Sequence, residues 1–244
     1  MVTAVLDCLK NIDILILAGG QGTRIRETLG DVPKLLAPIG RKTFFELLIL
    51  RLKLFGARRV ILSLGYLGNK VLHYLDANPP SGIEIITKVE PEPLGTAGSI
   101  RFIRSQITTN PVMVINGDSF FSTDLCEFVS SYRSNKLEAS ILCTHVDDIG
   151  RFGSLEISDD KLVKSFHEKH SEKSGSGFIN AGGYLFSTDM LDTISQMSGP
   201  SLEKDIFEKL PPRKLAAFIG KGIFIDIGIP EDLKRAESLL SPFA

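Results

Sequence analysis

The sequence predicts an α/β fold in which a mostly parallel β-sheet is flanked by helices and gains additional strands late in the chain. Short runs rich in β-branched residues alternate with helical patterns over the first half, at the spacing of β–α–β units. In the second half strand patterns follow one another directly, and no repeat with a period of about 20–50 residues occurs. The 244 residues (1–244) are expected to form a single domain, with its core at about residues 12–240.

Four strands are expected in the first half, each a short apolar run bounded by turn residues. They cover residues 12–17, 59–64, 83–89 and 112–115. Helices are expected between them at residues 43–56, 66–77 and 96–106. The first helix has the clearest ends, because Thr43 suits the N-cap position and Gly56 suits the residue after the C-cap.

The second half is expected to add four strands and three helices. The strands are predicted at residues 140–146, 153–157, 161–166 and 179–186, with a hairpin turn at 158–160. The helices are predicted at residues 188–197, 201–209 and 231–240. Pro230 fits the first helical position of the last one, because its missing N–H needs no partner there. Residues 171–177 are rich in serine and glycine and are expected to form a surface loop.

The composition excludes several classes of protein. Charged residues make up 23 % and hydrophobic residues 43 % of the chain, and the net charge is −1, which excludes extensive disorder and any general attraction to nucleic acid or an anionic membrane. No apolar run approaches the about 20 residues of a membrane-spanning helix, and the N-terminus lacks the pattern of a signal peptide. Three cysteines, Cys8, Cys126 and Cys143, form no Cys-x-x-Cys pair, which predicts reduced thiols in a cytoplasmic protein.

A glycine-rich loop follows the first predicted strand, at the carboxyl edge where ligands of such sheets bind. It contains Gly19, Gly20 and Gly22, and Arg24 and Lys34 extend it. Glycines let backbone N–H groups turn toward an anion. The loop lacks both the Gly-Lys-Ser/Thr of a P-loop and the third glycine of a dinucleotide-binding fold. The glycines alone are explained by a surface turn, whereas the loop with both cations favours binding of a polyphosphate.

Two aspartates accompany apolar strands in distant parts of the sequence. Asp118 follows the run 112–117, and Asp226 lies within the run 223–228. A carboxylate in an apolar strand is costly unless it is paired or binds a metal. Either residue alone is explained by a turn or by an ion pair with arginine. Together with the glycine loop, they favour a Mg²⁺ site that phosphate oxygens complete.

Two further segments give weaker signals. The segment after the third strand contains two prolines, which stiffen the chain before a helix that opens near Gly95 and Thr96. It suits a flat nucleobase about as well as it suits a rigid connector. Glu168, Lys169 and Asn180 follow or cross the late strands and suit sugar hydroxyls and a phosphate. The histidines have no cysteine partners at zinc-site spacing, and no Gly-x-Ser-x-Gly occurs, so neither zinc nor nucleophilic hydrolysis is indicated.

Four motifs together resemble the sugar-1-phosphate nucleotidyltransferases. They are Leu-Ala-Gly-Gly-Gln-Gly-Thr-Arg at 17–24, Pro-Lys at 33–34, Asn-Gly-Asp at 116–118 and Phe-Ile-Asp-Ile-Gly at 224–228. They occur in the order of the family, and the resemblance covers nearly the whole chain. It implies a Rossmann-like nucleotidyltransferase core and a reaction in which a nucleoside triphosphate and a sugar 1-phosphate give a nucleotide-sugar and pyrophosphate, with Mg²⁺ as cofactor. No hexapeptide repeat follows the core, so no β-helix tail is expected.

The resemblance also implies roles for individual residues. The backbone of residues 19–23 would cradle the nucleotide phosphates, Arg24 would bind the departing pyrophosphate, and Lys34 would lie between the reacting phosphates. Asp118 and Asp226 would hold the metal. The implied nucleotide-binding residues are Leu17, Ala18, Gly19, Gly20, Gly22, Thr23, Glu92, Gly95, Thr96 and Asn116. The implied sugar-phosphate-binding residues are Glu168 for the hydroxyls, Lys169 for the phosphate, and Asn180, Ala181 and Gly182 for the pocket wall.

Within the family, Glu-Pro-Leu-Gly-Thr-Ala-Gly at 92–98 is similar to the guanylyltransferase form of the base loop. The motifs that most resemble the D-glycero-α-D-manno-heptose 1-phosphate guanylyltransferases lie at 116–121, 151–155, 201–205 and 224–232. GTP and this heptose 1-phosphate are therefore the expected substrates. Leu35 and His170 depart from the pattern, since the family usually has proline at both positions. A mannose 1-phosphate guanylyltransferase, or a member that uses UTP or CTP, is the alternative.

Two functions outside the family are also open. A metal-dependent glycosyltransferase binds a nucleotide-sugar through carboxylates, but it would have Asp-x-Asp where this chain has Asn-Gly-Asp at 116–118. A non-catalytic regulatory subunit would bind a nucleotide-sugar after losing one of the four catalytic side chains, all of which are present. Neither nucleic acid nor membrane is an expected partner, and an apolar patch on the late strands would allow a homodimer.

Overall fold

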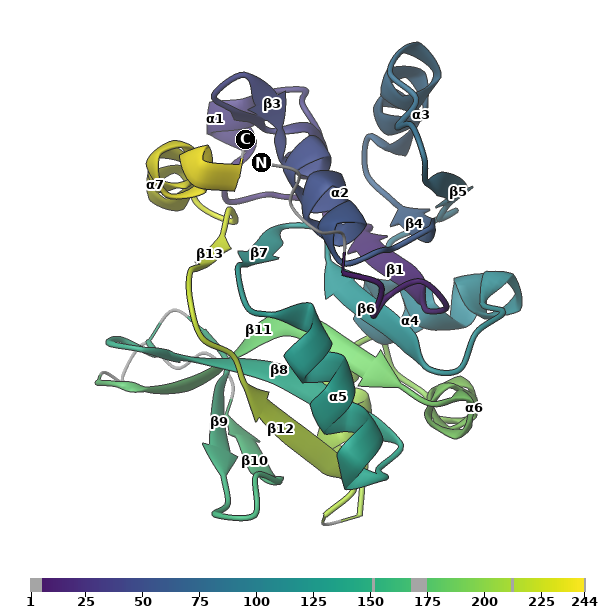
Figure 1. The fold of residues 1–244 in the computed structure, drawn as a ribbon. Coiled ribbons are helices and arrows are strands. Elements are labelled where there is room, and N and C mark those ends of the chain that lie inside the picture. Colours follow the sequence, from purple (N-terminus) through teal and green to yellow (C-terminus); the bar gives the residue numbers. More distant parts are fainter. Residues whose placement is uncertain (1–5, 151, 168–174, 212, 244) are drawn as a thin grey trace.

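A computed structural model describes residues 6–150, 152–167, 175–211 and 213–243. Its main sheet contains β1 (Asp13–Ala18), β4 (Arg59–Leu64), β5 (Glu84–Val89), β6 (Val112–Asn116), β8 (Ala139–Val146), β9 (Ser154–Ile157), β10 (Val163–His167), β11 (Gly177–Phe186) and β12 (Leu215–Ile219). The main path runs β10-β9-β11-β6-β1-β4-β5, while β8 pairs with β11 and with β12 (Figure 1). Two small sheets join β2 (Pro38–Ile39) to β3 (Lys42–Thr43) and β7 (Ser119–Phe121) to β13 (Phe224–Asp226).

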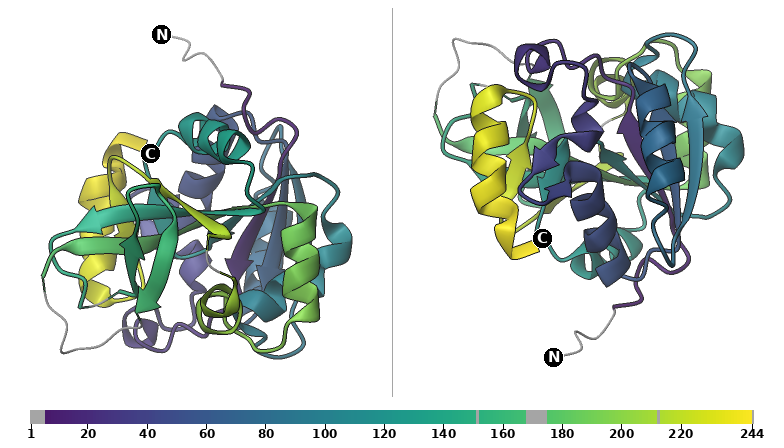
Figure 2. Two further views of the ribbon diagram at one scale, coloured as in Figure 1. Left: turned by 90° about the horizontal axis from the view of Figure 1, so that it is seen from below. Right: turned by 90° about the horizontal axis from the view of Figure 1, so that it is seen from above.

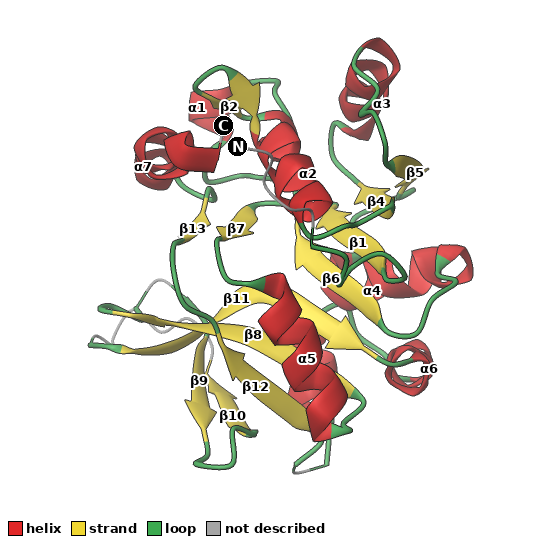
Figure 3. Ribbon diagram, viewed as in Figure 1, coloured by secondary structure: helices red, strands yellow, loops and turns green. Residues whose placement is uncertain are grey.

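Helices cover both faces of the main sheet (Figures 2 and 3). They are α1 (Arg26–Leu29), α2 (Phe44–Leu54), α3 (Gly68–Ala77), α4 (Gly95–Ile103), α5 (Leu125–Asn135), α6 (Thr188–Gln196) and α7 (Pro230–Leu240). Short 3₁₀ turns are η1 (Lys34–Leu36), η2 (Arg104–Gln106), η4 (Phe207–Lys209) and η5 (Ser241–Phe243), and η3 (Leu202–Ile206) is a π-helical turn.

The expected mostly parallel, helix-flanked sheet with additional late strands is confirmed. Strand β1 is parallel to both β4 and β6, and β5 is parallel to β4. The late strand β11 is antiparallel to β6, β8 and β9, and β9 forms the expected hairpin with β10. Strand β12 then returns to lie parallel to β8. The parallel half brings the carboxyl ends of β1, β4, β5 and β6 to one edge, which is where a ligand site is expected.

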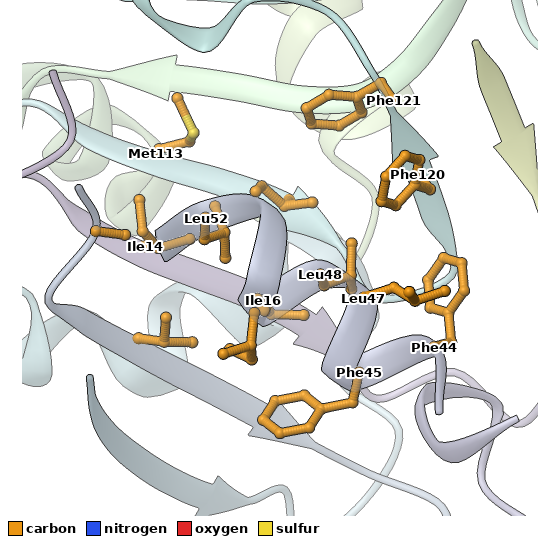
Figure 4. Packing of buried hydrophobic residues seen from close by; sticks show 14 of the residues in the cluster. Ile14, Ile16, Phe44, Phe45, Leu47, Leu48, Leu52, Met113, Phe120 and Phe121 are labelled. Carbon is orange, nitrogen blue, oxygen red and sulfur yellow. The ribbon is translucent and has the colours of Figure 1, made fainter. Parts of the chain in front are cut away.

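The core lies on both faces of the sheet, because alternate residues of β1 point in opposite directions. Ile14 and Ile16 belong to one apolar cluster together with residues of α2, as Figure 4 shows. Leu15 and Leu17 belong to a second cluster together with residues of α4 and α6. Burying each such side chain contributes roughly 1.5–3 kcal/mol. Burial on both faces explains why this strand is a continuous apolar run in the sequence.

The first long helix begins and ends where its sequence signals place it. The Thr43 hydroxyl accepts a hydrogen bond from the Glu46 N–H, and the Glu46 carboxylate accepts one from the Thr43 N–H, which forms a capping box. Gly56 follows the C-cap with a φ of +84°, and a Cβ there would lie 2.6 Å from the Leu6 carbonyl oxygen. Both the left-handed backbone and this close approach require glycine.

Several elements differ from the expectation. Helix α5 and strand β12 were not predicted, and the helix expected at 201–209 is instead the π turn η3 followed by the 3₁₀ turn η4. The helix expected at 96–106 ends at Ile103 and continues as η2. Part of the predicted loop at 171–177 lies outside the described residues, and β11 begins at Gly177.

The expectation of three reduced thiols is wrong for two of them. A disulfide joins Cys8, before β1, to Cys126 in the first turn of α5, across a sequence separation of 118 residues. Cys143 is free, and it is buried within β8. Its burial raises the pKa of the thiol, so this cysteine stays protonated.

Among the described helices, none combines the length and the apolar character that crossing a membrane requires.

Candidate active site

The glycine-rich loop lies at the carboxyl edge of the parallel strands. The Gly65 N–H after β4 donates to the Ala18 carbonyl (3.3 Å), and the Gly117 N–H after β6 donates to the Leu17 carbonyl (2.8 Å). These contacts hold the ends of three strands around the start of the loop. Gly22 has a φ of +61°, and a Cβ there would lie 3.2 Å from the Cε of Lys34. The loop therefore packs directly on the lysine stem.

Lys34 and Asp118, which the sequence predicts as site residues, meet in an ion pair. The Lys34 Nζ lies 3.0 Å from the Asp118 Oδ2, and the two side chains are 19 % and 31 % exposed. Lys34 comes from η1, and Asp118 comes from the turn between β6 and β7. This exposure leaves the pair accessible to a ligand and partly screened by water.

Asp226 lies beside the Asp118 turn because β13 pairs with β7. In this small sheet Asp226 is opposite Ser119, and the Ile227 N–H donates to the Asp118 carbonyl (2.9 Å). The Asp226 Oδ1 accepts a hydrogen bond from the Gly228 N–H (2.6 Å). The backbone pairing thus brings two aspartates from distant parts of the chain next to each other. Mg²⁺ takes one or two carboxylates beside phosphate oxygens. Within the described ranges, no group of three or more His, Cys, Asp or Glu side chains is arranged to hold a metal ion.

A cavity of about 330 Å³ opens between the glycine loop and the start of α4. The described residues that line it are Leu17, Gly19, Gly20, Gln21, Pro93, Gly95, Thr96, Ser99, Asn116 and Asp118. Seven of these were expected to bind the nucleotide or to take part in the transfer. The segment before α4 is therefore a cavity wall, which favours the nucleobase interpretation over that of a simple connector.

Several predicted residues are absent from this cavity wall, among them Ala18, Gly22 and Lys34. Three others are exposed. Glu92 is exposed, and Thr23 and Arg24 are exposed on the glycine loop. None of the three lines either of the two cavities described in this section. Arg24 is still within the loop that borders the nucleotide-side cavity, whereas Glu92 offers its carboxylate to solvent.

Glu90 is a buried carboxylate that sequence reasoning missed. Its Oε1 accepts hydrogen bonds from the hydroxyls of Ser63 (2.8 Å) and Ser99 (2.6 Å). A Cβ on Gly19 would lie 2.6 Å from the Glu90 Oε2, so a larger residue at this position of the loop would have to displace the hydrogen-bonded carboxylate. Glu90 thereby fixes the glycine loop against the segment that opens α4. Its position at the end of the third strand was the available signal.

A second cavity, of about 410 Å³, lies on the other side of Asn116. The described residues that line it are Asn116, Ser119, Phe152, Gly153, Phe166, His167, Asn180, Ser201, Glu203, Glu208 and Asp226. A bulge in β11 between Asn180 and Gly183 redirects the strand here. Gly182 has a φ of +75°, and a Cβ there would lie 2.8 Å from the Asn116 Nδ2.

The predicted sugar-side residues divide into three groups. Asn180 lines the second cavity, and Gly182 packs against Asn116 at its wall. Ala181 is buried within β11 and is not part of the lining. Glu168 and Lys169 lie outside the described residues.

Asn116 lies where the two cavities meet, since it lines both. Its Oδ1 is buried and has no hydrogen-bond partner among the described residues. A buried acceptor without a partner costs about 1–3 kcal/mol.

The molecule is an α/β protein with a glycine loop at the edge of a parallel sheet, a lysine–carboxylate pair and two adjoining cavities. The chain belongs to the nucleotidyl transferase family, whose sequence model matches residues 14–241, and it is an enzyme of that family.

The sequence is similar to those of two bacterial heptose guanylyltransferases. It is 35 % identical over 218 residues to D-glycero-alpha-D-manno-heptose 1-phosphate guanylyltransferase of Campylobacter jejuni, covering 89 % of this chain and 95 % of that protein. It is 34 % identical over 235 residues to the protein of the same name from Aneurinibacillus thermoaerophilus, covering 95 % and 100 %. A probable mannose-1-phosphate guanylyltransferase of rice is 34 % identical over 224 residues, which are 89 % of this chain and 62 % of that protein.

The fold is similar to that of HddC from Yersinia pseudotuberculosis. The crystal structure of HddC superimposes with a TM-score of 0.83 and 36 % identity, covering 93 % of this chain and 98 % of that one. The structure of HddC complexed with GMP-PN gives a TM-score of 0.80 and 35 % identity over the same shares.

Proposed function

We propose that this protein transfers GMP from GTP to D-glycero-α-D-manno-heptose 1-phosphate and releases pyrophosphate. The observation that carries the proposal is the meeting of two cavities at Asn116, with Asp118 lining one and Asp226 lining the other. Two relatives that match over nearly their full lengths bear the name of this activity, and the similar structure of HddC binds a guanine nucleotide analogue.

The transfer step needs charge and position more than it needs a chemical group from the protein. An oxygen of the sugar phosphate attacks the α-phosphorus of GTP, and the bond from that phosphorus to pyrophosphate breaks in line with the bond that forms. The phosphate dianion is already nucleophilic, so no side chain has to act as a general base. Lys34 neutralises charge on the reacting phosphates, and its pairing with Asp118 fixes where its ammonium group lies.

Mg²⁺ is the cofactor that we propose, and the donor set suits it. Asp118, in the turn before β7, and Asp226, on β13, would be its hard oxygen ligands, and substrate phosphates would complete the coordination. When bound, Mg²⁺ supplies positive charge that stabilises the phosphates during transfer.

The remaining sites are proposals of the same kind. The backbone of Gly19 and Gly20 binds the nucleotide phosphates, and Arg24, exposed on the same loop, binds the departing pyrophosphate. Gly95 and Thr96 lie against the nucleobase. Ala18, Gly22 and Thr23 complete the proposed phosphate loop, and Asn180 and Gly182 the proposed sugar pocket. Glu168 and Lys169 are proposed to bind the sugar hydroxyls and phosphate, as the family resemblance implies.

We also propose that the chain is one catalytic domain that works in the cytoplasm. A continuous sheet from β5 to β10 supports the first statement. The cysteines do not support a location in the cytoplasm, because Cys8 and Cys126 form a disulfide. Use of GTP, a nucleotide of the cytoplasm, supports it instead.

A grid of substrates tests the proposal most economically. GTP, UTP, CTP and dTTP are each incubated with the heptose 1-phosphate, mannose 1-phosphate or glucose 1-phosphate and Mg²⁺, and pyrophosphate is measured. The highest kcat/KM is expected for GTP with the heptose 1-phosphate. Mannose 1-phosphate as the better acceptor would favour the second candidate, which the similarity to the rice protein suggests. Equal rates with UTP or CTP would contradict the guanylyl assignment.

The same grid separates the functions outside the family. A glycosyltransferase would release no pyrophosphate and would consume a nucleotide-sugar in the presence of an acceptor glycan. A regulatory subunit would bind GDP-heptose without turnover for any pair of substrates.

A further inference from the structure

The wall of the second cavity contains a segment that none of the expected site residues belongs to. Residues 199–206, here called the linking segment, connect α6 to η4 and place Ser201 and Glu203 in the cavity lining. Its central turn is π-helical, which is uncommon and often marks a functional position.

The Glu203 carboxylate is held in place by three side chains. Its Oε1 accepts hydrogen bonds from the Tyr184 hydroxyl (3.1 Å) and the Asn180 Nδ2 (3.1 Å), and its Oε2 accepts one from the Ser201 hydroxyl (3.1 Å). A carboxylate offers about four acceptor positions. Glu203 therefore enters the cavity oriented, and it keeps capacity for a further donor.

Tyr184 is the donor in its hydrogen bond to Glu203, because its hydroxyl stays protonated. Its burial, and next the charge of Glu203, raise the pKa of the phenol well above its ordinary value. The hydroxyl stays protonated and donates to Glu203, while it accepts from the Asn180 Nδ2 at 2.7 Å.

The charges around the cavity indicate which part of a ligand meets Glu203. The described part of the lining contains the carboxylates of Glu203, Glu208 and Asp226 and one histidine, but no lysine or arginine. Carboxylates on the wall would repel a phosphate dianion, whereas sugar hydroxyls are neutral hydrogen-bond donors. Glu203 is thus suited to the hydroxyls of the acceptor.

The linking segment is also joined to the wall of the nucleotide-side cavity. The Leu202 N–H donates to the Thr96 hydroxyl (2.8 Å), and the Ala97 N–H donates to the Pro200 carbonyl (2.8 Å). Gly95 has a φ of +71°, and a Cβ there would lie 2.6 Å from the Pro200 carbonyl oxygen. The position of Glu203 is therefore set by the same residues that we propose lie against the nucleobase.

We infer that Glu203 is a specificity-determining residue that accepts a hydrogen bond from one hydroxyl of the sugar 1-phosphate, with Tyr184 and Asn180 as its positioning residues. This inference rests on the proposed function. A hydrogen bond to a charged group contributes about 1.5–3 kcal/mol, which corresponds to a change of roughly 10- to 100-fold in affinity.

The test compares Glu203→Gln with the wild type on a set of acceptors. The acceptors are the manno-configured heptose and hexose 1-phosphates and the hexose analogues that lack the hydroxyl at C2, C3, C4 or C6. In Glu203→Gln, KM for the parent acceptor is expected to rise about 10-fold or more, with KM for GTP unchanged. With the wild type, one deoxy analogue is expected to have a lower kcat/KM than the parent acceptor. With Glu203→Gln, the same analogue and the parent acceptor are expected to have equal kcat/KM values.

A matched control lies in the same cavity wall. Glu208 is exposed, and no hydrogen bond or ion pair holds its carboxylate in the described part of the chain, so Glu208→Gln is expected to change KM for the acceptor far less. If Glu203→Gln weakens all acceptors equally, or leaves their KM values unchanged, Glu203 has a structural role and the inference is wrong. A wild-type protein that releases no pyrophosphate with any pair of substrates instead overturns the proposed function, and this inference with it.

Discussion

Replacing Lys34 by methionine separates a catalytic from a structural role for the Lys34–Asp118 pair. The two side chains are 19 % and 31 % exposed, and an ion pair that water reaches contributes roughly 0–1 kcal/mol to stability. Methionine keeps most of the apolar stem that packs on Gly22, and Asp118 is still hydrated after the change. The free energy of unfolding is therefore expected to fall by less than about 1 kcal/mol.

The expected effect on turnover is much larger. Removing one group that stabilises charge in a transition state typically lowers kcat by about 10²–10³, or about 2.7–4 kcal/mol. The assay measures kcat by pyrophosphate release at saturating GTP and sugar 1-phosphate, and urea unfolding gives the stability of the same preparations. Lys34→Arg, which keeps the charge but changes the geometry, is expected to fall between the wild type and Lys34→Met.

Two results would refute this reasoning. A kcat close to the wild-type value in Lys34→Met would remove Lys34 from the transfer step. A loss of stability as large as the loss in transition-state stabilisation would mean that the pair supports the fold rather than the chemistry.

Three further predictions follow from the packing around the site. Gly19→Ala places a Cβ 2.6 Å from the Glu90 carboxylate and is expected to lower the free energy of unfolding in urea by about 1–3 kcal/mol. A Cβ at Gly20 meets nothing within 4 Å, so Gly20→Ala is expected to lower it much less. Thr96→Ala removes the hydroxyl that accepts a hydrogen bond from the linking segment, so KM for the sugar 1-phosphate should rise about 2- to 10-fold. Thr96→Ser keeps the hydroxyl and should have a KM close to that of the wild type. Equal KM values in both variants would contradict the proposed connection between the cavities. The raised pKa of Tyr184 means that folding favours the neutral phenol, so this stabilisation is fully present below about pH 10 and is lost as the pH rises through the folded pKa. Over this range the free energy of unfolding should fall less in Tyr184→Phe than in the wild type. An equal fall in both proteins would contradict this prediction.

The sequence was most informative where local chemistry decides the structure. The strand at Asp13–Ala18 is apolar on both faces because it is covered on both faces, and that run is visible without any partner. The ends of α2 follow from Thr43 and Gly56, whose roles depend on their immediate neighbours. The glycine loop and its approach to Lys34 were likewise predictable, since strand, loop and lysine are close in the chain.

Features that depend on distant segments were missed. Strand β12 adds to β8 from far along the chain, and the Cys8–Cys126 pair joins residues 118 positions apart. The linking segment is a π turn rather than an α-helix because its backbone is bonded to the start of α4, which no local pattern records. Glu203 was therefore unassigned.

Helix α5 was missed although its signals are local. Asp124 accepts hydrogen bonds from the first N–H groups of the helix, and Leu125, Phe128, Val129 and Tyr132 are buried at helical spacing. An N-cap residue before an amphipathic run is a sufficient local signal for this helix. Glu90 is a similar case, since it ends a predicted strand as Asp118 does.

If Asp118 and Asp226 converge on one divalent ion where the two cavities meet, each carboxylate contributes to the affinity for that ion. The most direct measurement is the affinity of Mn²⁺, titrated by electron paramagnetic resonance in the presence of GTP, for the wild type, Asp118→Asn and Asp226→Asn. Even outer-shell partners of metal ligands are worth about 10- to 100-fold in affinity, so each variant is predicted to bind Mn²⁺ at least about tenfold more weakly. Wild-type affinity in either variant would show that the substituted aspartate is not a ligand of the metal ion.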